Sequence, residues 1–585
     1  MKSQFTMNVT LLLALTVLLT GCNLNISSPK EEKTSDDAPL GVTSEETGIT
    51  EQYSVTEKTM PLYVDGFDNM EDMKVYFVNE TGVPYVSIDL FPHLLDEILE
   101  GDHIYEVSKD DEGSVVTITR KDSPYTAEFD FDDDTITFLD YDAFLRFEND
   151  ALVSFGGVSM FDDLFMPVDQ LTNDRYGKSM CFDLKPYEID LVKMDGGHYV
   201  PLQTFSDLFL TYYNRYSLYN GETVIITGAL DKDLDRIYYS SKPERTEAFA
   251  AYDYHELCFA LDHLYGLKEI HDIDSFDEYF DEIGIKKRLM GTDQTEADAV
   301  LYEFITCYLD DLHSGWRMES CGTDIKTLAD KTKDIRGPWK TKYENWIGEF
   351  EEVRNKAFPD GVEPYEEVGN TAYITFDSFT GPVPDMDYMS EPAEEELYDT
   401  VKLMQYSYGR IMRADSPVKN VVLDMSNNTG GSINAACYVL GMFLGVGDIN
   451  VKNTMTGAAT TSQYLIDANR DGKYDEKDSF ANQDLNLYCL ISPVSFSCGN
   501  LVPNEFKTDP HVTLIGKTSG GGSCSFMPMT TAGGTIFQIS GYRRMSVFKN
   551  GSFYDIDRGA EPDIYIDRID EYYDRDSLTE MINGL

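Results

Sequence analysis

The stretch SPVSFSCGN, residues 492–500, decides how this chain is interpreted because it joins an apolar strand to a helix. The apolar run Leu485–Ile491 precedes it and predicts a strand, and a second run, His511–Ile515, follows the helical segment. A serine at such a junction lies near backbone N–H groups and the positive end of a helix dipole, which stabilise developing negative charge. Ser497 is therefore a candidate nucleophile, and an ordinary helix-capping serine is the alternative interpretation.

Two further segments offer the partners that a nucleophilic serine requires. In NVVLDMSNNTGGSINA, residues 420–435, a buried strand ends at Asp424 and a glycine-rich turn opens a helix. Such a turn can point unpaired backbone N–H groups at an anion. In LDDLHSGW, residues 309–316, His313 follows a helix and stands among acidic residues. Because a serine hydroxyl needs a base to take its proton, His313 is the candidate general base.

The distribution of apolar residues divides the chain into regions of different character. Strands alternate with helices from about residue 366, which predicts an α/β domain within residues 346–585. Residues 240–345 carry apolar side chains at helical spacing, and residues 59–235 are β-rich with short helices. Within that β-rich part, VPYVSIDLF (83–91) resembles YVPLQTFSDLF (199–209), which suggests a duplicated small α+β module.

The N-terminal residues predict export and lipid anchoring. Residues 1–21 contain an apolar run too short to span a bilayer, and Leu19-Thr20-Gly21-Cys22 resembles a bacterial lipoprotein cleavage box. The expected product begins at a diacylated Cys22 on the extracytoplasmic face of the cell membrane. Residues 22–58, rich in Ser, Thr, Glu, Lys and Asp, predict a disordered tether.

Composition excludes one large class of partner. The 585-residue chain has 104 acidic and 47 basic residues, so that its formal net charge is -57. A surface of this kind repels nucleic acid, and no nucleic-acid partner is expected. The nine cysteines have no metal-binding spacing, and apart from Cys22 we expect mostly buried free thiols.

At this point a resemblance to a known family becomes clear. Residues 250–585 resemble the tail-specific (C-terminal-processing) serine peptidases, whose core is related to the ClpP/crotonase spiral fold. Five segments in family order carry the resemblance: Asp311-Leu312-His313-Ser314, Asp424 to Gly431, Phe496-Ser497-Cys498-Gly499, Ile515-Gly516-Lys517-Thr518, and Ala560-Glu561-Pro562-Asp563-Ile564.

Departures from the family pattern favour one branch of it. Asn500 stands where the family usually has an acid, and the stretch Ser519–Ser523 lacks the lysine of the Ser–Lys branch. The resemblance therefore implies the tricorn-like branch, in which His313 acts with a carboxylate. Asp557 is the favoured acid, and Asp555 and Glu561 are the alternatives.

The family resemblance implies a reaction and assigns roles within it. His313 accepts the Ser497 proton, the acid orients His313, and the backbone N–H groups of Gly430 and Cys498 hold the oxyanion until the acyl-enzyme is hydrolysed. We therefore interpret the protein as an exported, lipid-anchored serine-type endopeptidase with a peptide or protein substrate. The alternatives are a catalytically degenerate envelope protein that binds peptide or glycan, a serine esterase, and a site in which the Cys498 thiol is the nucleophile.

The segment DANRDGKYDEKD, residues 467–478, has the spacing of an EF-hand-type calcium loop. Gly472 stands at the sixth position, where such a loop must turn sharply. The predicted oxygen ligands are Asp467, Asn469, Asp471, the Lys473 carbonyl, Asp475 and Asp478. We therefore expect a structural Ca²⁺ ion here and no cofactor for catalysis, with a solvated acidic turn as the alternative.

Overall fold

The computed structural model describes residues 53–64, 71–99, 105–121, 124–145, 166, 168–381, 383, 386–549 and 552–585. Residues 53–585 form one compact unit. The predicted signal peptide and Cys22 lie outside the described residues, as does most of the predicted tether. The first strand begins at Val55, just before the expected end of that tether.

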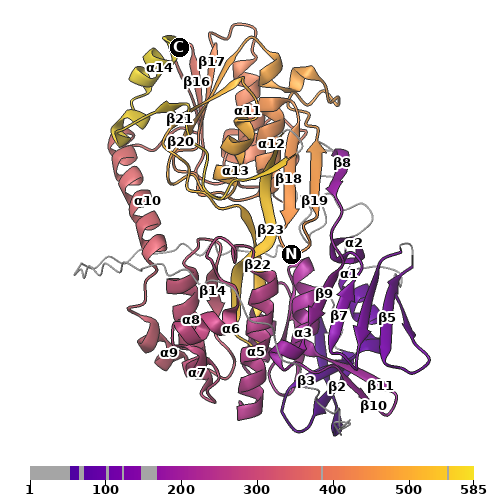
Figure 1. The fold of residues 1–585 in the computed structure, drawn as a ribbon. Helices are drawn as coiled ribbons and strands as arrows, with labels where there is room; N and C mark the ends of the chain where they lie inside the picture. The colour runs from indigo at the N-terminus through magenta and orange to yellow at the C-terminus, as the bar shows by residue number, and fades with distance from the viewer. Residues whose placement is uncertain are drawn as a thin grey trace, which may run out of the picture. The chain divides into compact units, whose positions relative to one another are not determined.

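The core sheet of the C-terminal half is parallel over most of its width (Figure 1). Its strands follow the order β15 (Tyr365–Val368), β16 (Thr371–Thr375), β17 (Asn420–Asp424), β20 (Asn486–Ile491), β21 (Val512–Gly516) and β25 (Ile564–Tyr565). Within this sheet, over the residues that the structure describes, the edge pair β15–β16 is the one antiparallel pair. The near-continuous apolar strands of the sequence reflect this arrangement, because both faces of a parallel sheet are buried.

Helices cover both faces of this sheet (Figure 1). Val421 and Leu423 of β17 pack in one cluster with α11 (Thr400–Ile411), α12 (Ile433–Leu444) and α13 (Cys498–Phe506). Val422, which points to the other face, packs in a cluster with α10 (Pro338–Ala357) and α14 (Arg575–Asn583). Local capping fixes the helix starts, since Asp399 accepts from N–H groups of α11 and Ser432 from one of α12.

A second sheet joins distant parts of the chain. It follows the order β14 (Gly315–Met318), β23 (Ile536–Lys549), β18 (Gly447–Asn453), β19 (Ala459–Tyr464) and β8 (Val168–Arg175), and β22 (Cys524–Thr530) and β24 (Ser552–Asp555) also pair with β23. The β-rich N-terminal part therefore contributes β8 to a sheet of the C-terminal half. On the other edge, Gly315 pairs with Gln538, which brings the segment after His313 to the core.

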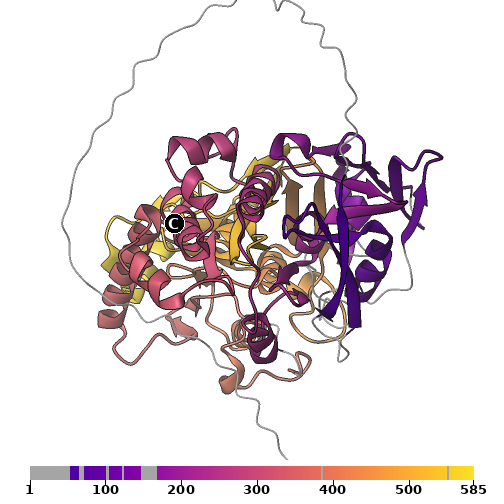
Figure 2. The same cartoon turned by 90° about the horizontal axis from the view of Figure 1, so that it is seen from below.

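The N-terminal part contains two further sheets, whose indigo and violet strands lie together in Figure 2. One follows the order β10 (Val192–Met194), β11 (Gly197–Pro201), β3 (Pro84–Ser87), β2 (Glu71–Val78), β1 (Val55–Val64), β13 (Val224–Thr227) and β12 (Tyr216–Tyr219). The other follows the order β4 (Tyr105–Lys109), β5 (Val115–Arg120), β6 (Thr126–Asp130), β7 (Thr135–Phe138) and β9 (Met180–Asp183). The short helices of this part are α1 (Phe91–Leu99), α2 (Tyr141–Leu145), α3 (Leu202–Phe205) and α4 (Lys232–Tyr238).

The two similar sequence segments of this part lie side by side. Strand β3 of the first pairs antiparallel with β11 of the second, and Val86 stands opposite Val200. Each strand leads into a short helix, as the shared pattern of apolar and polar residues predicts. The two segments therefore belong to one sheet and do not form separate units.

Most of the segment between the β-rich N-terminal part and the core sheet is helical. Its helices are α5 (Glu247–Leu264), α6 (Phe276–Glu282), α7 (Lys286–Leu289), α8 (Gln294–Phe304), α9 (Ile325–Thr332) and α10. A π-helical turn, Ile305–Leu309, continues α8 and ends at Asp310, whose carboxylate accepts from the backbone N–H groups of Trp339 and Lys340 at the start of α10. The predicted α/β fold with a helical region and a β-rich N-terminal module is confirmed.

Two properties of the described residues bear on the sequence predictions. The cysteines among them are all free thiols. Of the helices that the structure describes, none combines the length and the apolar character needed to cross a membrane.

Candidate active site

Ser497 lies in a tight turn between a strand and a helix. Strand β20 ends at Ile491, and α13 begins at Cys498, directly after the serine. Ser497 has φ +56° and ψ −121°, a conformation that L-residues rarely adopt. Such backbone strain typically costs about 1–3 kcal/mol and persists where the surrounding structure enforces it. The turn brings the hydroxyl group to the start of the helix, as the sequence pattern predicts.

The glycine-rich turn after β17 packs directly against Ser497. A Cβ atom on Gly430 would stand 2.6 Å from the Cβ of Ser497 and 2.8 Å from the Phe496 carbonyl oxygen. With φ +101°, Gly430 also has a backbone conformation that favours glycine. The two turns approach so closely that only a residue without a side chain fits between them.

The predicted role of Gly430 as an oxyanion donor needs correction. Its N–H group donates to the Asn428 side-chain oxygen at 2.9 Å, so it is already engaged. The next residue, Gly431, lines the cavity beside Ser497, and its N–H group makes no hydrogen bond within the described residues. The N–H group of Cys498 is likewise unpaired there. Sequence reasoning missed Gly431, although the Gly-Gly pair was the signal that could have pointed to it.

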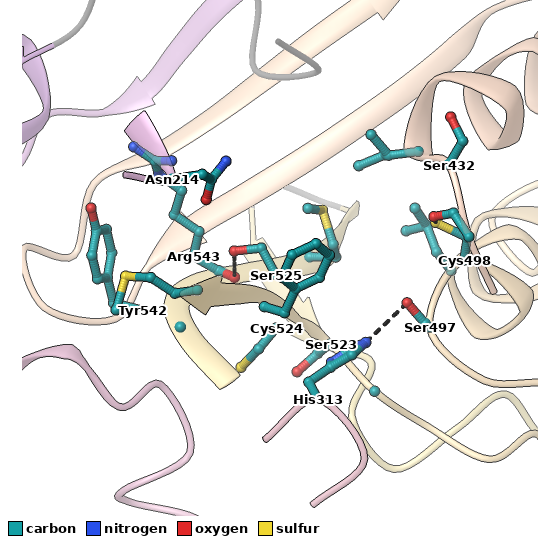
Figure 3. A pocket seen from close by; sticks show the side chains of 18 of the residues that line it. Asn214, His313, Ser432, Ser497, Cys498, Ser523, Cys524, Ser525, Tyr542 and Arg543 are labelled. Carbon is teal, nitrogen blue, oxygen red and sulfur yellow. Dashed lines mark hydrogen bonds between the residues drawn. The ribbon is translucent and has the colours of Figure 1, made fainter. Parts of the chain in front are cut away.

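His313 meets Ser497 across 184 residues of sequence. Its Nε2 atom lies 3.0 Å from Ser497 Oγ (Figure 3). The Gln538 side chain donates to the His313 carbonyl oxygen at 2.6 Å, and the imidazole packs against the Phe496 ring at 4.8 Å between centroids. Burial lowers the pKa of His313 from its usual 6.5, while Asp311 and Asp557 oppose that shift. The imidazole is therefore neutral at pH 7 and can accept a proton.

Two carboxylates act on His313 from a second cavity of about 440 Å³ that both of them line. Both oxygens of Asp311 are engaged, one by the N–H groups of His313 and Ser314 and the Ser540 hydroxyl, the other by the Tyr265 hydroxyl. The sequence prediction did not name Asp311 among the candidate acids, although its place two residues before His313 was a signal.

Of the two carboxylates, Asp557 is the one with an oxygen still able to accept a hydrogen bond from His313. Its Oδ1 accepts from the N–H and hydroxyl groups of Ser523 at 3.0 and 2.9 Å, and its Oδ2 makes no hydrogen bond among the described residues. The other predicted alternatives are held elsewhere. Asp555 pairs with Arg544, and Glu561 is exposed to solvent. No hydrogen bond joins His313 Nδ1 to a carboxylate in the part of the chain that is described.

Asn500 stabilises the site through buried hydrogen bonds. Its side chain is fully buried and donates to the Ile556 carbonyl oxygen at 2.9 Å, while its oxygen accepts from the Ser519 hydroxyl at 2.8 Å. These bonds tie α13, which begins after the serine, to the segment that carries Asp557. Since a neutral amide can donate and accept at once, Asn500 fills a bridging place for which a carboxylate would lack the donor.

The Cys498 side chain is unsuited to be the nucleophile. Burial raises the pKa of its thiol to about 12, and its Sγ donates to the Gly431 carbonyl oxygen at 3.2 Å. Because the thiolate is the reactive form, a thiol of this kind is inert at neutral pH. The hydroxyl group of Ser497 is the nucleophile that the geometry favours.

The predicted calcium loop has a curled backbone held by its own carboxylates. Asp467 accepts from the N–H groups of Asp471 and Gly472, and Gly472 has φ +75° at the predicted turn. At the twelfth position, Asp478 accepts from the N–H groups of Ala468 and Asp475. The remaining predicted ligands, Asn469, Lys473 and Asp475, lie in the same loop. Across the described residues no three histidine, cysteine or acidic side chains converge as a metal site.

A serine and a neutral histidine in hydrogen-bonding contact, beside two unpaired backbone amides, define a serine hydrolase type of site. Residues 370–566 of this chain match the model of peptidase family S41. No curated protein matches the sequence.

Several solved structures are similar in part. They include the photosystem II D1 C-terminal processing protease, with 17% identity over 34% of this chain and 42% of that one at a TM-score of 0.25. A putative peptidase from Parabacteroides merdae has 17% identity over 52% and 86% of the two chains at 0.35. Mature CPAF complexed with lactacystin has 12% identity over 57% and 99% at 0.36. At such TM-scores these likenesses carry no functional argument, and this chain spans less than half of the D1 processing protease.

Proposed function

We propose that this protein is a serine endopeptidase that cleaves peptide bonds through Ser497, His313 and Asp557. The observation that carries the proposal is the 3.0 Å contact between His313 Nε2 and Ser497 Oγ at the wall of a cavity of about 320 Å³. A cavity of this size accommodates a substrate side chain next to the reacting hydroxyl. The match of residues 370–566 to the model of peptidase family S41 supports a peptide or protein substrate.

In the proposed reaction the neutral His313 takes the Ser497 proton as Oγ attacks the peptide carbonyl carbon. The resulting imidazolium is stabilised by the two carboxylates that already oppose the downward shift of its pKa. Asp557 is the orienting acid, because its Oδ2 is free to accept from Nδ1. His313 then protonates the leaving amine, and water hydrolyses the acyl-enzyme by the reverse sequence of proton transfers.

The developing oxyanion is held by the backbone N–H groups of Gly431 and Cys498. Both residues line the cavity beside Ser497. The amide of Cys498 opens α13, so the helix dipole adds to its effect. Losing one donor of this kind typically costs about 10²–10³-fold in turnover.

The test compares wild-type protein with Ser497→Ala on a library of denatured proteins, with cleavage read by mass spectrometry. Ser240→Ala, an exposed serine of the N-terminal part, is the matched control. We expect new peptide ends with wild type and with the control, and none with Ser497→Ala. Cleavage that persists in Ser497→Ala would reject the proposal. Hydrolysis of esters without cleavage of peptides would favour an esterase, and binding without cleavage a degenerate peptidase.

The same proposal places the protein at the extracytoplasmic face of the cell membrane, anchored through lipid at Cys22. The support is the sequence Leu19–Cys22 after a short apolar run. Incorporation of a labelled fatty acid, lost in Cys22→Ala, tests it.

We also propose that residues 467–478 bind a structural Ca²⁺ ion. Asp467 and Asp478 are 1% and 3% exposed, and burial together with the Asp467 charge raises the pKa of Asp478. Two buried like charges at the first and twelfth loop positions suit a divalent cation, and an all-oxygen ligand set suits Ca²⁺. In this proposal the carboxylates and the Lys473 carbonyl hold the ion, which stabilises the loop and takes no part in catalysis.

A further inference from the structure

The peptide group between Gly430 and Gly431 decides whether the turn beside Ser497 can hold an oxyanion. The two glycines have φ +101° and +132°, a backbone conformation that residues with a side chain rarely adopt. Because neither residue has a Cβ atom, such a peptide group can turn its N–H or its carbonyl toward the cavity at little steric cost. An N–H group there stabilises an oxyanion, whereas a carbonyl oxygen repels it. Neighbouring residues therefore have to fix the orientation of this one peptide group.

Two donors from one neighbouring segment hold the Gly430 carbonyl oxygen. The Phe379 N–H group donates to it at 2.8 Å, and the Ser378 hydroxyl donates to it at 2.9 Å. Residues 378 and 379 are not among the described residues that line the cavity. In a trans peptide group the carbonyl and the N–H point in opposite directions. With its carbonyl bound to this segment, the peptide group turns the Gly431 N–H away from the segment and toward the cavity.

The segment that carries Ser378 is itself anchored. The Asp377 carboxylate accepts two hydrogen bonds, of 2.6 and 2.8 Å, from the guanidinium of Arg354 in α10. The Asp377 carbonyl oxygen also accepts from the N–H group of Thr429, at 2.9 Å. The segment therefore runs beside the glycine turn and presents the Ser378 hydroxyl at a fixed place.

Asn428 restrains the preceding peptide group in the opposite sense. Its side-chain oxygen accepts from the Gly430 N–H at 2.9 Å, and its side-chain amide donates to the Phe376 carbonyl oxygen at 3.1 Å. These contacts leave the Gly431 N–H, and not the Gly430 N–H, for the oxyanion. Asn428 is fully buried, so that its replacement would disturb folding, whereas Ser378 is only half-buried. Ser378 is therefore the side chain at which the orientation can be tested.

We propose that Ser378 is a positioning residue whose hydroxyl holds the Gly430 carbonyl, so that the Gly431 N–H faces the oxyanion. The inference rests on the proposed peptidase function and adds a residue to the machinery of that site. Ser378 acts through the peptide group and not by contact with the substrate. A carbonyl that accepts two hydrogen bonds is also more strongly polarised, which makes the N–H of the same peptide group a better donor. Loss of the hydroxyl therefore weakens the oxyanion site in two ways.

The experiment uses the full-length protein, a peptide that the wild type cleaves, and two inhibitors with the sequence that precedes the cleaved bond. One inhibitor is a peptide aldehyde. Its carbonyl carbon forms a bond to Ser497 Oγ, and the oxygen of the resulting tetrahedral adduct occupies the oxyanion site. The other inhibitor is the matching peptide amide, which binds without forming an adduct. The ratio of the two affinities therefore reports on the oxyanion site alone.

We expect Ser378→Ala to weaken this site without abolishing it. The Phe379 N–H still holds the carbonyl, so the effect is smaller than the loss of about 10²–10³-fold that follows removal of an oxyanion donor. We expect kcat to fall about tenfold with KM unchanged within about twofold, and the aldehyde to bind about tenfold more weakly. Amide affinity stays the same. Ser378→Thr keeps the hydroxyl and retains most of the activity.

Two further variants complete the comparison. Ser179→Ala removes a hydroxyl that likewise donates to a backbone carbonyl, that of Phe138 in the N-terminal part, and it keeps the wild-type kcat and both affinities. If Ser378→Ala does not fold, Ser378→Cys replaces the hydroxyl by a thiol, which is a weak donor, and the same fall in the affinity ratio is expected.

The outcomes separate positioning from a structural effect. A structural effect of Ser378→Ala weakens aldehyde and amide together and leaves their ratio unchanged, which overturns the inference. Wild-type kcat and aldehyde affinity in Ser378→Ala overturn it as well. In both cases cleavage by the wild-type protein leaves the proposed function intact. If the wild type cleaves no peptide and binds no aldehyde, the proposed function fails and takes the inference with it.

Discussion

Replacing Gly430 by alanine tests the close packing on which the site depends. The added methyl group would lie 2.6 Å from Ser497 Cβ, 2.8 Å from the Phe496 oxygen and 3.2 Å from the Cys498 nitrogen. Contacts below 3.0 Å with backbone-anchored atoms cannot be relieved by rotating a side chain. One of the two turns must therefore move, and both carry parts of the proposed machinery.

The expected cost has two components. Alanine at a positive φ costs about 1–2 kcal/mol in backbone energy, which lowers stability. A displacement of about 1 Å between nucleophile and base costs about 10²-fold in rate. We therefore expect kcat/KM of Gly430→Ala to fall by about 10²-fold or more, mainly through kcat.

Gly457→Ala is the matched control, because Gly457 has φ +74° and nothing lies within 4 Å of an added Cβ. It should lose comparable stability in thermal unfolding and keep its activity within about twofold. Steady-state kinetics on one fluorogenic peptide, with unfolding followed by circular dichroism, separates the two effects. Wild-type kcat/KM in a folded Gly430→Ala protein would refute the packing argument.

Three other predictions concern protonation, support and metal binding. Burial lowers the pKa of His313 from 6.5, and its neutral form is the base. We therefore expect kcat/KM to rise with pH through a midpoint below 6.5 and to stay high at pH 7. A midpoint above about 7 in the pH–rate profile would contradict this prediction. Asn500→Ala leaves buried partners unsatisfied, so denaturant titration should find it about 1–3 kcal/mol less stable, and an unchanged midpoint would remove its bridging role. Calorimetry should detect Ca²⁺ uptake that Asp467→Ala abolishes and the exposed Asp484→Ala preserves; no uptake by wild type would reject the calcium loop.

The fold class could be predicted from the local sequence pattern. Both faces of the core sheet are buried, so its central strands are apolar along most of their length. Continuous apolar runs such as residues 420–424 and 486–491 identified central strands without any knowledge of their partners. The turn at Ser497 was also visible, since strand, serine and helix follow each other within a few residues.

Features that depend on distant contacts were not visible. The contribution of β8 to a sheet of the C-terminal half depends on pairing between segments far apart in sequence. The choice between Gly430 and Gly431 depends on a single side-chain contact from Asn428, which no periodicity reveals. Likewise, the sequence alone left three candidates for the acid that orients His313, namely Asp557, Asp555 and Glu561. The side chains that bind each of these carboxylates come from other segments, so their contacts could not be predicted.

The most direct test of the central claim is a reaction with a fluorophosphonate probe, followed by mapping of the adduct by mass spectrometry. The account predicts one adduct, on Ser497, that forms slowly in His313→Ala and is absent from Ser497→Ala. An adduct on any other serine, or undiminished labelling of Ser497→Ala, would contradict it.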